Sequence, residues 1–119
     1  MQIAFTPARH PVPTNAIAVT CDGRRFVFTG DSNQDALVEL FAEGADLLLA
    51  DCGLSEADHR FNAPHYSAKL CGELAKNTRA KRLLLTHLNP KYDPHALLDE
   101  ARALYPAAEI AQPGEIYYI

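Results

Sequence analysis

Two runs of three leucines, Leu47–Leu49 and Leu83–Leu85, constrain the fold of this chain more than any other feature. A strand with one face in water alternates apolar and polar residues, whereas a continuous apolar run is typical of a strand buried on both faces. Such strands occur mainly in sheets whose parallel neighbours are connected by helices. The two runs therefore predict an α/β fold with a parallel or mixed sheet.

The remaining elements agree with this fold class. Asp22-Gly23 predicts a tight hairpin, because such turns need positive φ angles. Ser32 is the expected N-cap of the first helix, and Asp93 that of the third. Strands are predicted at Gln2–Thr6, Ala16–Thr20, Arg25–Thr29, Ala45–Ala50, Lys81–Thr86, Glu109–Ala111 and Glu115–Ile119, and helices at about Gln34–Ala42, Tyr66–Thr78 and Pro94–Leu104.

The predicted helices are enough to cover one face of the sheet and leave nothing for the other. A chain of 119 residues is expected to form a single domain, residues 1–119, because domains usually have roughly 100–200 residues. The leucine runs nevertheless require both faces of their strands to be buried. We therefore expect a large apolar sheet face that needs a partner, either a second copy of the chain or a different chain.

Composition excludes several classes of protein. The formal net charge of −4 provides no electrostatic footprint for nucleic acid, so an RNA partner would need a local basic patch. No segment approaches the roughly 18 apolar residues of a membrane helix, and Met1–His10 lacks the apolar core of a signal peptide. Cys21, Cys52 and Cys71 form no C-x-x-C pair and are expected to be reduced, buried thiols. These features predict a cytoplasmic protein.

Two predicted strands end in side chains that bind cations. Phe26–Thr29 runs into Gly30-Asp31, and Leu83–Thr86 runs into His87. Ligands of α/β sheets bind beyond the carboxyl ends of the strands, so Asp31 and His87 are expected at one site, with His10 as a third candidate ligand. Taken singly, a Gly-Asp step is more often a turn, and a histidine at a strand end is more often structural. Taken together, the three residues favour a metal site.

Other polar residues fall near the same predicted edge. His65 precedes a helix and is either a proton donor aimed at the site or part of the helix cap. Asp51 either orients a histidine or is a plain turn residue at the start of the long loop to Ala63. Lys91 and Tyr92 could hold an anionic substrate, although a surface loop is the simpler interpretation. The two remaining histidines, His59 and His95, are expected in solvent.

Four segments together resemble the metallo-β-lactamase superfamily, and most closely its ribonuclease Z-like branch. They are Thr29-Gly30-Asp31-Ser32, Gly44 to Asp51, His65-Tyr66-Ser67-Ala68 and Arg82 to Tyr92. In that family a Gly-Asp step supplies a carboxylate that bridges two metals, and a leucine-rich strand ends in Thr-His. The chain departs from the family at Asp51, where Glu is common, and from the ribonuclease branch at Asn89 and Lys91, where Ser and Arg are common.

The resemblance implies a site and a mechanism. His10, Asp31 and His87 would be ligands of zinc, or of manganese or iron, with two ions in the complete site. Asp31 would also act in catalysis as the bridging carboxylate, and His65 would assist proton transfer. The activity implied is metal-dependent hydrolysis of a phosphodiester or other ester, with RNA processing as one form of it.

The resemblance also implies an incomplete protein. The His-x-His-x-Asp-His motif of the family is absent from these 119 residues, and the family fold is an αββα sandwich of two similar halves. Residues 1–119 are therefore expected to form the C-terminal half, with three helices on one face of a mixed sheet, and to be inactive alone. The expected partner is an N-terminal half-domain or a second copy on the open sheet face. The alternative is a non-catalytic, self-associating module derived from such a hydrolase.

Overall fold

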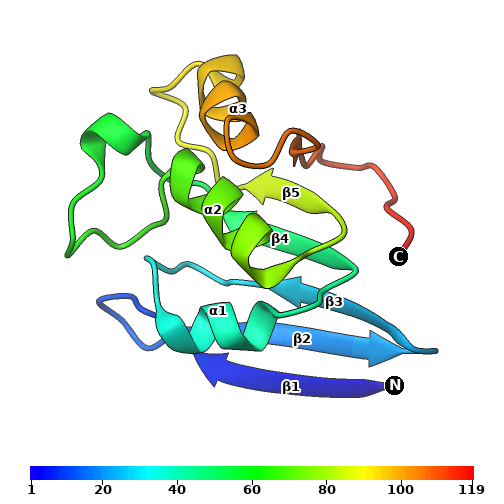
Figure 1. Cartoon of the computed structure of the whole chain (residues 1–119). Coiled ribbons are helices and arrows are strands. Elements are labelled where there is room, and N and C mark those ends of the chain that lie inside the picture. The colour runs from blue at the N-terminus through cyan, green and yellow to red at the C-terminus, as the bar shows by residue number, and fades with distance from the viewer.

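A six-stranded mixed sheet forms the centre of the molecule, whose computed structural model describes residues 1–119 (Figure 1). The strands lie side by side in sequence order: β1 Gln2–Pro7, β2 Asn15–Cys21, β3 Arg24–Phe28, β4 Leu47–Asp51, β5 Leu83–Thr86 and β6 Glu109–Ile110. The first three are antiparallel, and β3 to β6 are parallel. The helices are α1 Ala36–Ala42, α2 Ala68–Thr78 and α3 Pro94–Arg102, with a 3-10 turn, η1, at Glu56–Asp58. The α/β fold class is confirmed.

Caps and turns set the limits of these elements. The hairpin at Asp22-Gly23 has φ angles of 50° and 75°, as predicted for this tight turn. Asp93 caps α3 by accepting a hydrogen bond from the His95 N–H. The prediction that Ser32 caps α1 is wrong: Asp35 is the cap, and its carboxylate accepts hydrogen bonds from the first turn.

Two further predictions need correction. Glu115–Ile119 forms no strand, although Gln112–Glu115 closes a turn after β6. Not all three cysteines are buried: Cys21 lies exposed at the end of β2, while Cys52 and Cys71 are buried, and all three are free thiols. Cys21 is exposed because it ends a strand beside the hairpin, where no helix covers the sheet.

The main core lies between the sheet and the helices. Val27, Leu48, Leu83 and Leu85 point to the helix side and are fully buried. Helices α2 and α3 pack closely on one another, since a Cβ on Gly72 of α2 would overlap the backbone of Ala101 in α3. The middle leucine of the first run and the outer two of the second therefore serve this core.

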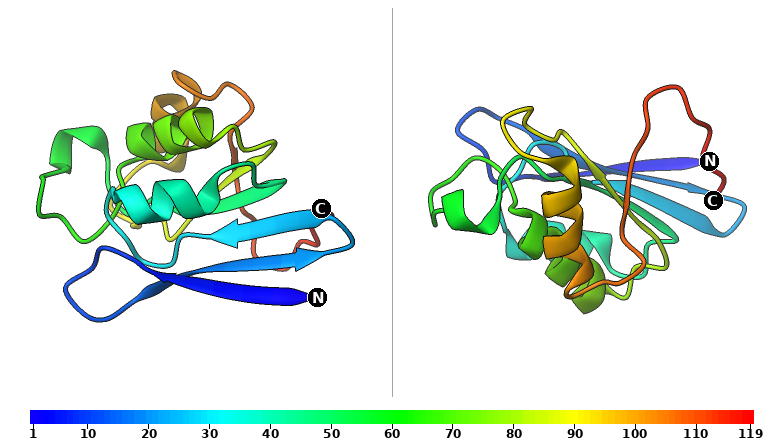
Figure 2. Two further views of the ribbon diagram at one scale, coloured as in Figure 1. Left: turned by 60° about the horizontal axis from the view of Figure 1, so that its bottom comes forward. Right: turned by 90° about the horizontal axis from the view of Figure 1, so that it is seen from above.

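The opposite side is apolar across five strands, and we call it the open sheet face. Cross-strand pairing and the alternation of burial place these side chains on it: Ile3, Phe5, Ile17, Val19, Phe26, Phe28, Leu47, Leu49 and Leu84. The three helices all lie on the other side of the sheet, as the two views of Figure 2 show. The predicted one-sided helix layer is therefore confirmed.

The C-terminal segment covers part of the open sheet face, which the sequence reasoning did not foresee. Tyr117 and Ile119 join Phe26, Leu49 and Leu84 around an entirely apolar hollow of about 360 Å³. The C-terminal segment does not cover β1, where Ile3 and Phe5 are 53% and 63% exposed. The apolar surface left without cover therefore lies over the antiparallel strands.

Candidate active site

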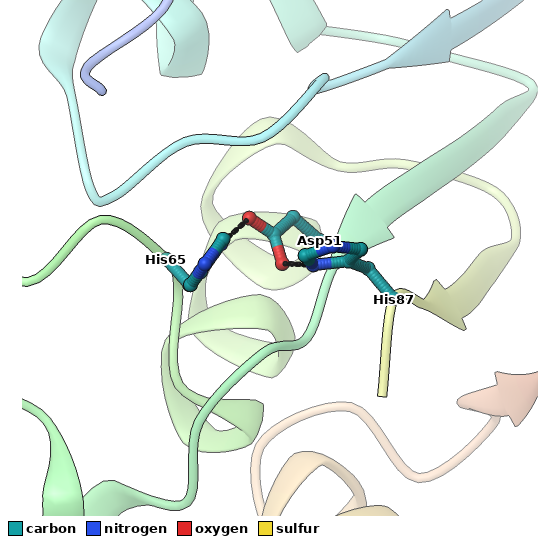
Figure 3. Close-up of side chains that lie close together, drawn as sticks. All are labelled: Asp51, His65 and His87. Atoms are coloured by element: carbon teal, nitrogen blue, oxygen red, sulfur yellow. Dashed lines mark hydrogen bonds and ion pairs between the residues drawn. The ribbon is translucent and has the colours of Figure 1, made fainter. Parts of the chain in front are cut away.

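The site lies beyond the carboxyl ends of β4 and β5, where two polar side chains follow the leucine runs (Figure 3). Asp51 is the last residue of β4, and His87 comes directly after β5. The parallel register pairs Asp51 with Thr86, so the two polar residues come side by side. His87 Nδ1 lies 3.2 Å from Asp51 Oδ1.

His65 reaches the same carboxylate from the loop before α2. Its Nδ1 lies 2.7 Å from Asp51 Oδ2, and its ring centroid lies 4.8 Å from that of His87. Helix α2 starts just after it, because the Ser67 hydroxyl accepts a hydrogen bond from the Leu70 N–H. The histidine is thus not part of the cap, and the alternative that aimed it at the site agrees with the geometry.

Asp51 orients both histidines at once. Its side chain is fully buried, and Oδ2 also accepts a hydrogen bond of 3.0 Å from the Ser32 backbone N–H. Burial raises the pKa of Asp51 above its ordinary value, while the hydrogen bonds from His65 and Ser32 oppose that rise. An ionised Asp51 accepts Nδ1–H from each ring, which leaves Nε2 of His65 and His87 as the nitrogen available to a ligand.

Asp31 and His87, the two strand-end residues, come together as predicted. Asp31 Oδ1 lies 3.9 Å from His87 Nε2. The positions of Asp31 and His87 both depend on residues with positive φ angles. Gly30 has φ of 62°, and a Cβ there would lie only 2.6 Å from the Asn15 carbonyl oxygen, so no other residue fits before Asp31. His87 has φ of 59°, which costs a residue other than glycine about 1–3 kcal/mol and is typical of functional positions.

His10 lies at the outer side of the histidine group. Its ring centroid is 5.7 Å from that of His65, so the three rings of His10, His65 and His87 follow one another. Arg9 fixes the segment that carries His10. Its backbone N–H donates to Ser32 Oγ at 3.0 Å, and its guanidinium donates to the Phe61 carbonyl oxygen at 2.7 Å. This arginine thus joins the loops that bear His10, Asp31 and His65.

The other polar residues near the site bind one another. Tyr92 Oη donates to Asp58 Oδ2 at 2.6 Å, and Lys91 Nζ lies 3.1 Å from the same oxygen, so both belong to the simpler surface-loop interpretation. His59 is not free in solvent, because its Nε2 lies 2.7 Å from Asn33 Oδ1. His95 is exposed at the start of α3, as expected.

Sequence reasoning missed one residue of the site altogether. A Cβ on Gly53 would lie 2.7 Å from His65 Cγ, closer than packed carbon atoms approach. The imidazole therefore packs directly on the backbone of residue 53. Its position two residues after Asp51 was the signal that could have been used.

The donors fit a divalent transition metal. One ligand atom each from Asp51, His65 and His87 lie within 4.8 Å of one another. Asp31 adds a second carboxylate beside His87 Nε2, and imidazole with carboxylate is a ligand set suited to zinc, iron or manganese. Asp51 already binds Nδ1 of two histidines, which is the arrangement of a carboxylate that orients metal-binding imidazoles.

Comparison with known proteins identifies the family of the chain. The model of the "Beta-lactamase superfamily domain" family matches residues 1–88, which is most of the chain. The chain belongs to the metallo-β-lactamase superfamily. The superfamily resemblance is thereby confirmed. Membership of this superfamily implies divalent metal ions, and Asp51, His65 and His87 form a possible ligand group for one.

The chain is similar in sequence to a probable metallo-hydrolase and to ribonucleases Z. Over 118 residues the chain is 33% identical to a probable metallo-hydrolase, YhfI, of Bacillus subtilis. The matched region is 97% of the chain and 48% of YhfI. Ribonuclease Z of Archaeoglobus fulgidus is 34% identical over 94 residues, 76% of the chain and 31% of the relative. The chain thus spans less than half the length of these two relatives.

Solved structures give the same grouping. The crystal structure of YhfI superposes with a TM-score of 0.89 at 32% identity, over 97% of the chain and 48% of that protein. The short form of human tRNase Z superposes with a TM-score of 0.66 at 28% identity, over 75% of the chain and 36% of that protein.

No helix of the present structure has the length and apolarity to cross a membrane.

Proposed function

We propose that this chain forms the C-terminal half of a metal-dependent hydrolase that cleaves a phosphodiester or other ester in the cytoplasm. The observation that carries the proposal is the buried Asp51 carboxylate, which holds His65 at 2.7 Å and His87 at 3.2 Å beside Asp31. A buried carboxylate with two histidines at the carboxyl edge of a sheet is costly to maintain for structure alone. It is the arrangement expected where imidazoles must keep one tautomer and one orientation.

Each residue then has a role. His10, Asp31 and His87 are the proposed metal ligands, and two ions of zinc, manganese or iron are proposed for the complete site. The metals would supply a water of low pKa and a Lewis acid that polarises the ester. His65, held by Asp51, donates a proton to the leaving oxygen through Nε2. Asp51 acts through the two histidines and is a positioning residue.

The remaining ligands are proposed to come from an N-terminal half-domain with the His-x-His-x-Asp-His motif. Two observations support this partner. Asp31, Asp51, His65 and His87 lie together at one edge of the sheet, with His10 beside His65 and with His87 half-exposed. The open sheet face carries Ile3 and Phe5 uncovered. Packing of that half on the open sheet face would bury the apolar side chains and bring the missing ligands to the site.

The test mixes the chain with a separately expressed N-terminal half-domain that carries the motif. A 1:1 complex that retains zinc through gel filtration and hydrolyses bis(p-nitrophenyl) phosphate is the expected result. Elemental analysis that finds no metal in the mixture contradicts the proposal. A stable dimer of the chain that shows no metal-dependent turnover, with or without the half-domain, would instead support the non-catalytic, self-associating module.

Paired variants locate the contact. Phe5→Glu places a charge on the open sheet face, and Leu40→Glu places one on the helix side, where Leu40 is 69% exposed. The first is expected to abolish complex formation, because a buried unpaired charge is strongly unfavourable. The second is expected to leave it unchanged. Equal effects of the two variants would show that the partner does not pack on the open sheet face.

A further inference from the structure

A cavity of about 280 Å³ adjoins the site between two loops. Gly53 and Leu54 line it from the loop after β4, and residues 88–90 line it from the loop after β5. His65 and His87 belong to its lining, so the cavity and the proposed proton donor share a wall. The four other main hollows border α1 or the open sheet face and include none of these histidines.

The position of the cavity determines which part of a substrate it receives. Nδ1 of His65 is bound to Asp51, so only Nε2 is free to deliver a proton. In the proposed hydrolysis, a P–O bond forms to the oxygen of water and the P–O bond to the alcohol breaks. The alcohol oxygen takes its proton from His65, and the water releases one to solvent. The leaving alcohol must therefore lie beside His65, where this cavity is.

The lining selects a small neutral group. Leu54, Leu88 and Pro90 present apolar surface, and no lysine, arginine, aspartate or glutamate lines the cavity. Asn89 Oδ1 accepts a hydrogen bond of 3.0 Å from the Lys91 N–H, which leaves its Nδ2 amide as a donor without a partner in the protein. An apolar alcohol with one acceptor fits these walls better than a charged chain does.

The cations of the surrounding loops contact other groups of the protein. Arg9 donates to the carbonyl oxygens of Gln34 and Phe61, and Arg60 donates to two carbonyl oxygens of its own loop. Lys91 pairs with Asp58 at 3.1 Å. RNA binding draws its affinity from several lysines or arginines that neutralise phosphates. Beside the cavity Lys91 is neutralised by Asp58, and Arg9 and Arg60 keep their charge but do not belong to the lining of the cavity. A small substrate needs no such row of contacts.

We infer that the substrate is a small-molecule phosphoester whose neutral leaving group occupies this cavity, and not RNA. This inference rests on the proposed function and narrows it. It distinguishes the chain from the ribonuclease Z relatives and assigns a specificity role to Leu88 and Asn89.

Titration followed by NMR tests the inference without any metal or turnover. The 119-residue chain is titrated with phenyl phosphate and, separately, with a single-stranded RNA of 12 nucleotides. Phenyl phosphate is expected to shift the methyl signals of Leu54 and Leu88 and the side-chain amide of Asn89. Asn89→Trp fills the cavity and should weaken this binding at least tenfold. Asn77→Trp, which is also at an exposed position but on α2, should not change it.

Two outcomes overturn the inference. One is RNA binding that shifts the same signals and weakens steeply with salt, which would assign the site to a polyanion. The other is phenyl phosphate that shifts signals elsewhere or binds both tryptophan variants equally. The proposed function fails differently: the reconstituted pair would hold no zinc, whatever the cavity binds.

Discussion

Replacing Gly53 by alanine should displace His65 while leaving the proposed metal ligands in place. The added Cβ would lie 2.7 Å from His65 Cγ, 2.8 Å from its Cβ and 3.1 Å from its Cδ2. Packed carbon atoms approach to about 3.5 Å, so the side chain must move by about 0.8 Å. A movement of that size is enough to lengthen the 2.7 Å hydrogen bond to Asp51 beyond the usual limit of about 3.2 Å.

Two consequences follow from this displacement. Overpacking of this kind is expected to lower the free energy of unfolding by about 1–3 kcal/mol. Because His65 is the proposed general acid, its displacement is expected to lower the rate of the proposed complete hydrolase by about 10²- to 10⁴-fold for esters with poor leaving groups. Esters of p-nitrophenol should lose far less, because that leaving group departs without protonation.

The assay combines ¹⁵N NMR of the imidazoles with rates on the two ester types. In the native chain His65 is expected to carry its proton on Nδ1, and in Gly53→Ala this tautomer should lose its dominance. Gly23→Ala is the matched control: its φ of 75° makes alanine cost about 1–2 kcal/mol, and no atom lies within 4 Å of the new Cβ. An unchanged His65 tautomer in Gly53→Ala, or equal rate losses in both variants, would refute the reasoning.

Two further variants test the charges that support the fold and the site. Burial raises the pKa of Asp51, so in the native chain the free energy of unfolding declines as pH rises through that raised pKa. Asp51→Asn removes the carboxylate and should abolish this decline. The free energy of unfolding of Asp51→Asn at pH 7 should therefore not fall. The zinc affinity of the proposed complete enzyme, measured by calorimetry, should drop about 10- to 100-fold. A variant that is less stable but binds zinc with unchanged affinity would contradict this. Asp46 accepts hydrogen bonds from Lys81 Nζ and the Arg25 N–H, which lower its pKa below 3.8. Its contribution to the free energy of unfolding is therefore present above pH 3.8 and is lost as pH falls through the lower pKa of the folded state. Asp46→Asn should reduce stability in urea unfolding at pH 7 more than at pH 2.5, and equal losses at both would count against the pair.

Sequence reasoning located the site because parallel strands align their ends. Asp31 and His87 each follow an apolar strand, and that pattern alone placed them at one edge, where they lie 3.9 Å apart. The roles of His10, Asp31 and His87 as metal ligands remain predictions. The same reasoning left Asp51 and His65 undecided, because a turn residue and a cap residue have the same local sequence as an orienting pair.

Local signals failed where a tertiary contact competed for the same group. Ser32 has the sequence context of an N-cap, but its hydroxyl accepts a hydrogen bond from the Arg9 N–H and its own N–H donates to Asp51. Asp35 took over the cap of α1. Glu115–Ile119 alternates like a strand, yet Tyr117 and Ile119 cover the apolar open face without pairing to β6.

The amino-acid sequence by itself determined the α/β fold class, the single helix layer and the edge at which the site lies. Each depends on short-range periodicity or on the alignment of parallel strand ends, and both can be read along one chain. Only the tertiary structure decided that Asp51 binds both histidines, that Gly53 makes room for His65, and that a cavity lies beside them. These depend on approaches of a few ångströms between loops far apart in the sequence, which no local pattern specifies.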